Sequence, residues 1–329
     1  MPRLQRSSRV GANDGDSRTG CYPQPRMLRL PDSALIYEVG PRDGLQNEPA
    51  PVPTDVKVDF VNRLVATGLP YVEVSSFVHP RWIPQLADAE EVFARIDRRE
   101  GTRLGALVPN ARGLNRALEA NVTDLAVFVS ASETHNRKNL NRTIDESLEN
   151  IAEVIAGVDR EKTWIRGYVS MVFGCPYEGE VEVASIIRVA TRLLELGCDQ
   201  ISLGDTVGYG TPRDVQERVM EIAPEVPLDK VALHFHDTRG TALANIVAGL
   251  DAGVRVFDGA VGGLGGCPYA PGASGNVATE DLIQMLHGMG VDTGVDLEAL
   301  VDCAAFIESH LKKRLPSRYL RVARGACDI

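Results

Sequence analysis

The sequence predicts a single (β/α)8 TIM barrel with a short additional helical segment near its C-terminal end, and two observations lead to this fold. From Ala34 onward, short runs rich in β-branched residues alternate with amphipathic helical stretches, giving eight such pairs without a shift in composition. A barrel of this type typically needs about 250 residues, and the chain has 329. A doubly wound open sheet is the competing fold, but it would not naturally contain eight repeats.

Short apolar runs give the strands, and stretches whose apolar residues recur at three- and four-residue spacing give the helices. Val58, Val61, Leu64 and Val65, for example, mark the buried face of one helix. The predicted strands cover residues 35–39, 71–75, 104–108, 124–129, 165–171, 200–203, 231–236 and 256–261. The predicted helices cover 55–66, 84–95, 111–120, 144–156, 181–196, 212–222 and 242–252, and an added helix covers 297–311.

A segment of different composition precedes the repeats. Residues 1–26 are rich in Arg, Ser and Gly and have no apolar period, which predicts a disordered N-terminal arm. The barrel domain is then expected over residues 27–329. A transit peptide would also be rich in Arg and Ser, but Asp14 and Asp16 weaken that alternative.

Charge and hydrophobicity argue against several classes of protein. The net charge of −10 disfavours general nucleic-acid binding, because phosphate binding uses clustered Lys and Arg. The sequence has no run of 18 apolar residues and no apolar core of a secretory signal, so we expect a soluble, cytoplasmic protein without a membrane partner. The six cysteines form no Cys-x-x-Cys pair and are expected to be reduced thiols.

The predicted barrel indicates where catalytic side chains should lie. In this fold, catalytic groups lie at the C-terminal ends of the strands. Chemically capable side chains fall at those ends here. They are Arg42 and Asp43 after the first strand, Glu73 in the second, Asp205 after the sixth, and His234 and His236 in the seventh.

His234 and His236 are candidate metal ligands. Side chains alternate along a strand, so the two imidazoles project from one face about 7 Å apart. Such a pair alone is more often structural, and a hard divalent ion would need oxygen ligands as well. Asp43 and Asn276 offer these oxygens, although an aspartate in an Asp-Gly turn can instead bond its own backbone.

Three further residues have possible chemical roles. Arg42 presents a rigid fork of donors that suits a developing oxyanion. Cys267 lies in a glycine-rich loop over residues 262–268, which lacks the ending of a phosphate-binding loop and is interpreted as a mobile flap that carries a reactive thiol. Glu280 either supports the metal ligands or places a favourable charge on the first turn of a following helix.

Several long motifs lie along the chain. They are EVGPRDGLQNE at 38–48, GCPYEG at 174–179, SLGDT at 202–206, HFHDT at 234–238, GGCPYA at 265–270 and GASGN at 272–276. These motifs resemble those of the 3-hydroxy-3-methylglutaryl-CoA (HMG-CoA) lyase family, and the similarity covers nearly everything from Ile36 to about Arg314. Arg239 and His79 depart from the family pattern, which has an aromatic residue and a small polar residue there, and either can tune the acyl pocket.

The resemblance implies a metal-dependent carbon–carbon lyase that cleaves HMG-CoA to acetyl-CoA and acetoacetate by a retro-Claisen step. It implies a Mg or Mn ion held by Asp43, His234, His236 and Asn276. Arg42 and Cys267 are implied to be catalytic, with Asp43 or His234 as the base. The implied substrate-binding residues are Gln46, Glu73, Ser76, Asp205, Glu280, Lys312, Lys313 and Arg314, of which the last three meet the CoA phosphates.

The resemblance also suggests a biological setting. Cleavage of HMG-CoA belongs to leucine degradation and ketone-body metabolism. A homodimer is expected, and in some relatives a terminal thiol, here Cys327, crosslinks subunits.

Three alternative functions stay open at this point. A citramalyl-CoA lyase would share the barrel, the metal and the cleavage step, and no residue excludes it. A Claisen synthase such as isopropylmalate synthase runs the same bond chemistry in the forming direction, but usually has an extra regulatory domain. A non-catalytic CoA- or metal-binding scaffold would be expected to lack some of the ligands or the loop cysteine, all of which are present.

Overall fold

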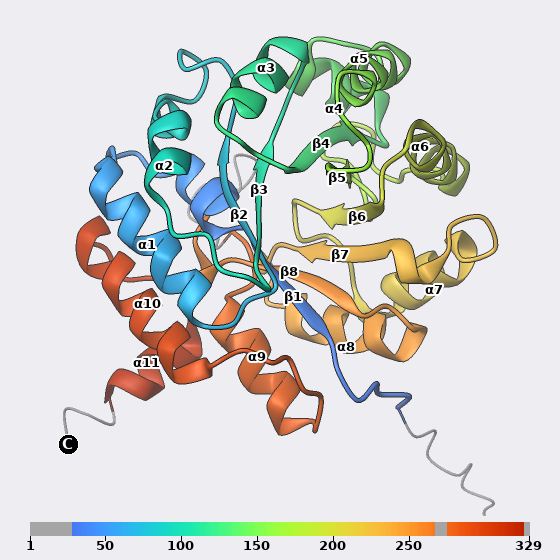
Figure 1. Cartoon of the computed structure of the whole chain (residues 1–329). Helices are drawn as coiled ribbons and strands as arrows, with labels where there is room; N and C mark the ends of the chain where they lie inside the picture. Colours follow the sequence, from blue (N-terminus) through green and yellow to red (C-terminus); the bar gives the residue numbers. More distant parts are fainter. Residues whose placement is uncertain (1–27, 267–274, 326–329) are drawn as a thin grey trace, which may run out of the picture.

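Eight parallel strands form a closed barrel in the computed structural model, which describes residues 28–266 and 275–325. Each strand pairs with the next one in the sequence, and β8 pairs with β1. Helices surround the barrel on its outside (Figure 1). The predicted TIM barrel is therefore confirmed. The predicted N-terminal arm and Cys327 lie outside the described residues.

Most elements agree with the sequence prediction to within one or two residues. The strands are β1 (Leu35–Glu38), β2 (Tyr71–Ser76), β3 (Arg103–Leu107), β4 (Asp124–Ser130), β5 (Trp164–Ser170), β6 (Gln200–Asp205), β7 (Val231–Phe235) and β8 (Val256–Gly259). The helices of the repeats are α1 (Thr54–Ala66), α2 (Ala89–Arg95), α3 (Ala111–Glu119), α5 (Ile144–Ala156), α6 (Val183–Leu196), α7 (Pro212–Ile222), α8 (Ala242–Ala252) and α9 (Thr279–Gly288). None of the helices in the described part of the chain is long and apolar enough to span a bilayer.

Three helical segments differ from the prediction. The single helix predicted over 84–95 is divided into a short 3-10 turn (Pro84–Leu86) and α2, because Asp88 turns its carboxylate to Thr54 and Lys57 of α1 at 2.7 Å. The prediction missed α4 (Glu133–Leu140), whose polar sequence lacks an apolar stripe. It also missed α11 (Arg318–Gly325), which follows the correctly predicted α10 (Leu297–Leu311).

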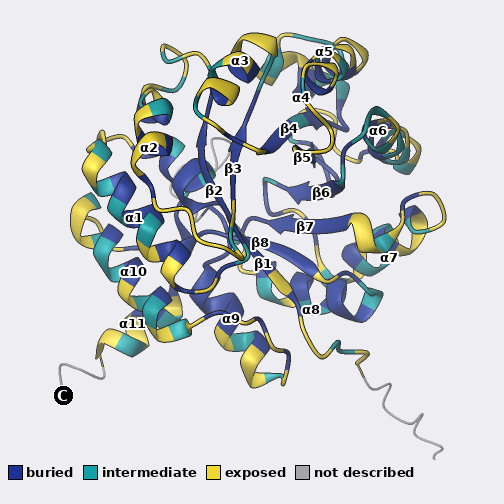
Figure 2. Ribbon diagram, viewed as in Figure 1, coloured by how far each residue is buried: buried dark blue, intermediate teal, exposed yellow. Residues whose placement is uncertain are grey.

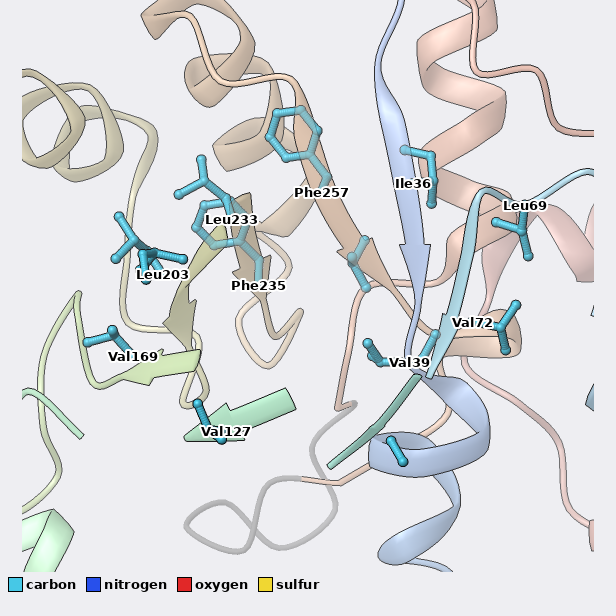
Figure 3. Close-up of a cluster of buried hydrophobic side chains, with 14 of the residues drawn as sticks. Ile36, Val39, Leu69, Val72, Val127, Val169, Leu203, Leu233, Phe235 and Phe257 are labelled. Atoms are coloured by element: carbon cyan, nitrogen blue, oxygen red, sulfur yellow. The ribbon is translucent and has the colours of Figure 1, made fainter. Parts of the chain in front are cut away.

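Apolar side chains fill the layer between the strands and the helices (Figure 3). Leu233 on β7 and Phe257 on β8 are fully buried there and pack against α8. Because side chains alternate between the two faces of a strand, the neighbouring residues on these strands point into the barrel. The residues that fill the interior include aromatic and charged side chains as well as small ones such as Ala232 (Figure 2 shows the buried strands).

The interior is arranged in two levels. Tyr37 and Tyr71 stack at a ring distance of 4.5 Å, and Trp164 packs against both, at the N-terminal ends of the strands. Above them lies the fully buried Arg166, which pairs with Asp258 at 2.5 Å. The pair of Arg166 and Asp258 therefore lies nearer the end of the barrel at which the strands finish, while a second pair, Arg103 and Asp124 at 2.7 Å, lies where β3 and β4 begin.

A buried carboxylate connects the two strands that close the barrel. Glu38, at the end of β1, accepts hydrogen bonds from the backbone N–H of Gly40 (2.7 Å), the N–H of Val261 (2.9 Å) and the hydroxyl of Thr279 (2.6 Å). Burial raises the pKa of Glu38 to about 8. The ends of β1 and β8 and the start of α9 are thus held together at one point.

The C-terminal segment packs back onto the mouth of the barrel. Asp281 on α9 accepts hydrogen bonds from the Ser317 hydroxyl (2.9 Å) and from the N–H groups of Arg318 and Tyr319 (3.0 and 2.6 Å). Leu315 lies against the turn at Gly262, where an added Cβ would come within 2.2 Å of its side chain. The segment that precedes α11 is therefore fixed beside the glycine-rich turn that follows β8.

The close approach of α8 to the barrel gives a stability prediction. Glycine normally destabilises a helix, but a Cβ at Gly249 would lie 2.6 Å from Leu233 and 3.1 Å from Phe257. We expect Gly249→Val to lower the free energy of unfolding by about 2 kcal/mol through overpacking. The measurement is urea denaturation. Gly288→Ala is the control, because nothing lies within 4 Å of its added methyl, and equal stabilities of the two variants would contradict the prediction.

Candidate active site

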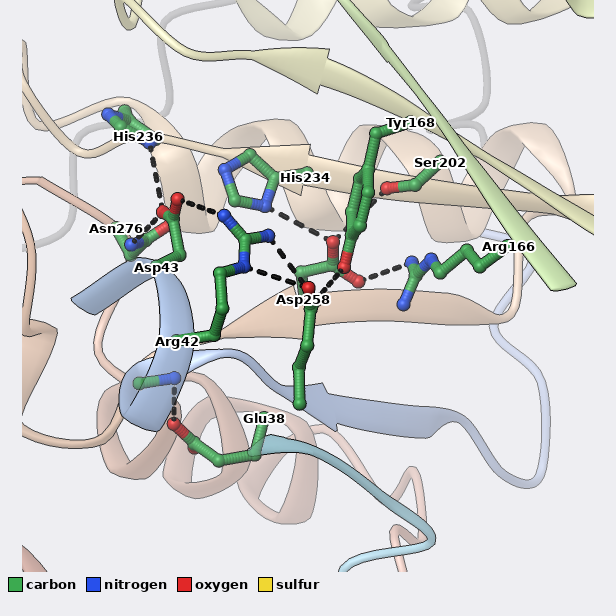
Figure 4. Close-up of polar contacts among 12 residues, drawn as sticks. Glu38, Arg42, Asp43, Arg166, Tyr168, Ser202, His234, His236, Asp258 and Asn276 are labelled. Atoms are coloured by element: carbon green, nitrogen blue, oxygen red, sulfur yellow. Dashed lines mark hydrogen bonds and ion pairs between the residues drawn. The ribbon is translucent and has the colours of Figure 1, made fainter. Parts of the chain in front are cut away.

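The first strand delivers two functional side chains to the mouth of the barrel. β1 leads directly into a single π-helical turn, Gly40–Gly44, in which the N–H of Asp43 donates to the carbonyl of Val39 at 2.7 Å. A side chain at Gly40 would meet Glu38 at 2.4 Å, so glycine is needed there. This tight turn places Arg42 and Asp43 beside His234 and Asn276 (Figure 4).

Asp43 and the two histidines converge as the sequence predicted. Asp43, His234 and His236 each offer one ligand atom, and these atoms lie within 4.8 Å of one another. The Nε2 of His236 is 4.0 Å from Oδ2 of Asp43, and the side-chain N–H of Asn276 donates to the same oxygen at 2.8 Å (Figure 4). The four predicted ligand residues therefore form one cluster.

The donor set fits a divalent cation. One carboxylate, two imidazoles and an amide are an acceptable ligand set for Mg²⁺ or Mn²⁺. Burial and the neighbouring His234 lower the pKa of His236 to about 3, so its imidazole is neutral. Burial alone would raise the pKa of Asp43, but Arg42 and the histidines lower it to about 2, so its carboxylate is ionised. These are the protonation states that metal ligation requires.

Arg42 is held by two carboxylates and a ring. Its guanidinium donates to Glu73 at 2.8 and 3.3 Å and to Asp43 at 2.7 Å. Burial would lower the pKa of Arg42, but Glu73 and Asp43 raise it above its usual value. The Tyr168 ring lies 5.5 Å from the guanidinium carbon, and its hydroxyl donates to Glu73 at 2.5 Å. The arginine is thus a fixed cation beside the metal-ligand cluster.

A cavity of about 260 Å³ opens onto these groups. Gln46 and Ser76, both predicted to bind substrate, line it, and the Gln46 amide lies 3.5 Å from Asp43. Apolar side chains, among them Leu107 and Phe128, also line it. The cavity can therefore receive a ligand that combines polar oxygens with a hydrocarbon part.

Two predicted substrate-binding residues contact loop backbone instead of the cavity. Asp205 accepts hydrogen bonds from the N–H groups of Tyr209 (2.9 Å) and Gly210 (2.8 Å), and burial raises its pKa. Glu280 is fully buried on the first turn of α9, where it accepts from the N–H of Gly262 at 2.9 Å and burial raises its pKa to about 7. Their direct contact with substrate stays a prediction.

Positive charge lies at the rim between α10 and α11. Lys313 pairs with Glu48 at 2.5 Å, while Lys312 and Arg314 are exposed on either side of it. Glu48 lines a groove of about 390 Å³ beside Trp82, and this groove shares Gln46 with the cavity. Cys267, the predicted reactive thiol, lies outside the described residues.

Two expectations about the acyl pocket receive no support from the placement of the side chains. Arg239 donates to the carbonyls of Val207 and Gly208 and covers the Tyr209 ring, away from the cavity. His79 lines a separate surface groove of about 700 Å³ against α3 and α5. This groove is the larger space, but it contains none of the predicted site residues.

Four residues that were not predicted from the sequence lie beneath the metal-ligand cluster and contact its members or one another. They lie on β5, β6 and β8. For two of them, which form an ion pair, the available signal was a charged residue within an apolar strand, because a buried charge needs a partner. The pair is Arg166 in WIRGYVS and Asp258 in VFDG. The four residues are Arg166, Tyr168, Ser202 and Asp258.

Comparison with known proteins agrees with this geometry. The family model described as HMGL-like matches residues 34–307. A hydroxymethylglutaryl-CoA lyase of Bacillus subtilis is 50% identical over 91% of this chain and 100% of its own length. A 3-hydroxy-3-isohexenylglutaryl-CoA/hydroxymethylglutaryl-CoA lyase of Pseudomonas aeruginosa is 47% identical over 88% of this chain and 97% of its own.

A solved structure supports the same relationship. The HMG-CoA lyase of Acinetobacter baumannii, in complex with coenzyme A and 3-methylmalate, superposes with a TM-score of 0.84 at 41% identity, covering 88% of this chain and 95% of that one. Sequence identity, fold and extent of the match all point the same way. The chain belongs to the hydroxymethylglutaryl-CoA lyase family.

Proposed function

We propose that this protein cleaves HMG-CoA to acetyl-CoA and acetoacetate with the help of a divalent cation, Mg²⁺ or Mn²⁺. The observation that carries the proposal is the convergence of Asp43, His234 and His236 beside the buried Arg42 in one cavity. The relatives at 47–50% identity are named as lyases of this reaction. The proposal is therefore supported both by the family to which the chain belongs and by the residues that line its cavity.

The reaction breaks the bond between C2 and C3 of the acyl group. The 3-hydroxyl must lose its proton, C3 becomes the ketone of acetoacetate, and the bonding electrons pass to C2 as the enolate of acetyl-CoA. A cation held by Asp43, His234, His236 and Asn276 would supply Lewis acidity, which lowers the pKa of the hydroxyl.

The side chains of the chain supply the remaining functions. Arg42 donates to the thioester oxygen, on which the enolate charge develops, and its pairing with Glu73 keeps it in place. Asp43 is the proposed base for the hydroxyl proton. His234 is the other predicted candidate, but its Nδ1 lies 3.1 Å from Asp258 and its second ring nitrogen would be a ligand of the cation, so no free lone pair is left for this proton. Cys267 is the proposed acid that returns a proton to C2. Among the described residues, Arg42, Asp43 and His234 all line one cavity.

The proposed path of the CoA arm out of this cavity is the groove lined by Glu48 and Trp82. This groove shares Gln46 with the cavity, and Lys313 pairs with Glu48. We propose that Lys312, Lys313 and Arg314 meet the phosphates of CoA, since an acidic protein needs local cations for such a ligand. The A. baumannii structure contains coenzyme A, which supports this kind of ligand.

The acyl group is open to a second candidate. The P. aeruginosa relative is named for a substrate with an isohexenyl group as well as HMG-CoA, and a larger group would lie against the apolar side chains of Leu107 and Phe128. Citramalyl-CoA is the other candidate substrate. A cytoplasmic location, a homodimer and a role in leucine or ketone-body metabolism stay predictions.

Metal dependence is the first test of the function. EDTA should abolish acetoacetate release from HMG-CoA, and added Mg²⁺ or Mn²⁺ should restore it, because the hydroxyl is too weakly acidic without a Lewis acid. Citramalyl-CoA and the isohexenyl substrate are assayed in parallel. If the protein cleaves citramalyl-CoA or the isohexenyl substrate but not HMG-CoA, the mechanism stands and the substrate assignment is wrong. If it cleaves none of the three substrates with either metal, the proposal is rejected.

Arg42→Lys tests the role of the arginine. Lysine keeps the charge but loses the fork that contacts Glu73 and Asp43 together, so we expect kcat to fall by about 10²–10³-fold. Steady-state kinetics and thermal unfolding are measured together. The control is Arg112→Lys on the exposed side of α3. A folded Arg42→Lys variant with unchanged kcat would contradict the assigned role.

Lys313→Ala tests the proposed CoA contact. A phosphate contact remote from the reacting bond contributes to binding equally in ground and transition states, so KM should rise by about 10-fold while kcat changes little. The control is Lys230→Ala, because Lys230 lies before β7 at the opposite end of the barrel. If KM is unchanged, or if kcat falls instead, the phosphates of CoA are bound elsewhere.

A further inference from the structure

The carboxylate of Asp258 lies behind one of the predicted metal ligands and has no assigned role. Asp258 is on β8, points into the barrel and is 2% exposed. Its Oδ2 lies 3.1 Å from Nδ1 of His234 and accepts from the Ser202 hydroxyl at 3.1 Å. Its Oδ1 accepts from Arg166 at 2.5 Å (Figure 4). Both carboxylate oxygens are therefore occupied by fixed partners.

Arg166 keeps the carboxylate in the form that only accepts hydrogen bonds. The guanidinium is fully buried, with the Tyr37 ring 4.6 Å and the Tyr168 ring 5.0 Å from its central carbon. An arginine stays charged at any working pH, and a buried pair of this kind is stable only when both members are ionised. The hydrogen in the contact between Asp258 and His234 therefore belongs to the imidazole.

We propose that Asp258 is a positioning residue that fixes the tautomer and the ring orientation of His234. With its Nδ1–H donated to Asp258, His234 presents the lone pair of Nε2 to the cluster that also contains Asp43 and His236. A carboxylate behind a ligating imidazole sets its tautomer and raises its basicity in this way. The inference rests on the proposed metal-dependent function of the cluster.

The second histidine is oriented differently, which makes the inference specific to His234. Among the described residues, Nδ1 of His236 has no hydrogen-bond partner. Its backbone is fixed instead, because its N–H donates to the carbonyl of Asp205 at 3.0 Å and the residue bridges to Asn276. Loss of Asp258 should therefore disturb His234 and leave the placement of His236 intact.

A purely structural role is the competing explanation. If Asp258 only neutralises Arg166, its removal would lower the stability of the fold and leave the affinity for metal unchanged. If it positions His234, the affinity for metal must change even at temperatures where the variant is fully folded. Metal affinity and thermal unfolding therefore separate the two explanations.

The first experiment compares Asp258→Asn with Asp124→Asn in the full-length protein, using Mn²⁺ as the probe. Titration followed by EPR of free Mn²⁺ gives Kd, and thermal unfolding shows whether each variant is folded. We expect Asp258→Asn to raise Kd by about 10- to 100-fold. Asp124→Asn also removes a buried strand carboxylate that pairs with an arginine, Arg103 at 2.7 Å, but it lies where β4 begins and should bind Mn²⁺ as the unsubstituted protein does. Equal Kd values for a folded Asp258→Asn variant and the unsubstituted protein would overturn the inference.

A second measurement does not depend on whether Asp258→Asn folds. The unsubstituted protein is labelled with ¹⁵N-histidine, and the ring-nitrogen shifts are recorded with and without Mg²⁺; His234→Gln identifies the signals of His234. The inference requires protonation at Nδ1 in both samples, and an Nε2–H tautomer in the metal-free protein would overturn it. If the unsubstituted protein does not bind Mn²⁺, the metal part of the proposed function fails, while the tautomer still decides the role of Asp258.

Discussion

Inside the mouth of the barrel, two arginines lie away from water, and each is paired with carboxylates. Arg42 contacts Glu73 and Asp43, and Arg166 contacts Asp258. Removing a charge from water costs several kcal/mol unless a partner replaces the lost hydration, so these side chains are confined to the positions in which the pairs form. Tyr168 lies between the two arginines and contacts Glu73. The site geometry follows from this pairing.

The same pairing gives the two histidines, and the two aspartates beside them, different environments. Both histidines are buried, yet His234 lies against a carboxylate whose charge is balanced from below, while His236 lies beside Asp43 at the open end. Asp43 itself is more exposed than Asp258, at 16% against 1% for the side chain. One carboxylate can therefore meet an incoming cation, and the other is available only to the protein.

Much of the fold was predictable because a barrel repeats one simple pattern, and the strand ends named in advance carry Asp43, His234 and His236, which do come together. The polar interior was harder to predict. Arg166 and Asp258 are separated by 92 residues, and nothing in either strand indicates which opposite charge is its partner. Helix α4 has no apolar stripe and is held by capping and by hydrogen bonds from Asn136, which periodicity does not reveal.

The seam between β1 and β8 has a consequence for how the chain is made. The hydrogen-bond partners of Glu38 lie far along the chain, with Val261 223 residues later and Thr279 241 residues later. Asn276, the partner of Asp43, lies 233 residues after it. During synthesis these two carboxylates have none of these partners until β8 and the start of α9 have left the ribosome. Contacts of such sequence separation form late and slow folding. In a nascent chain that ends before β8, the polar end of the first strand is therefore still hydrated. The contacts that position the active-site residues form in the same step that closes the barrel.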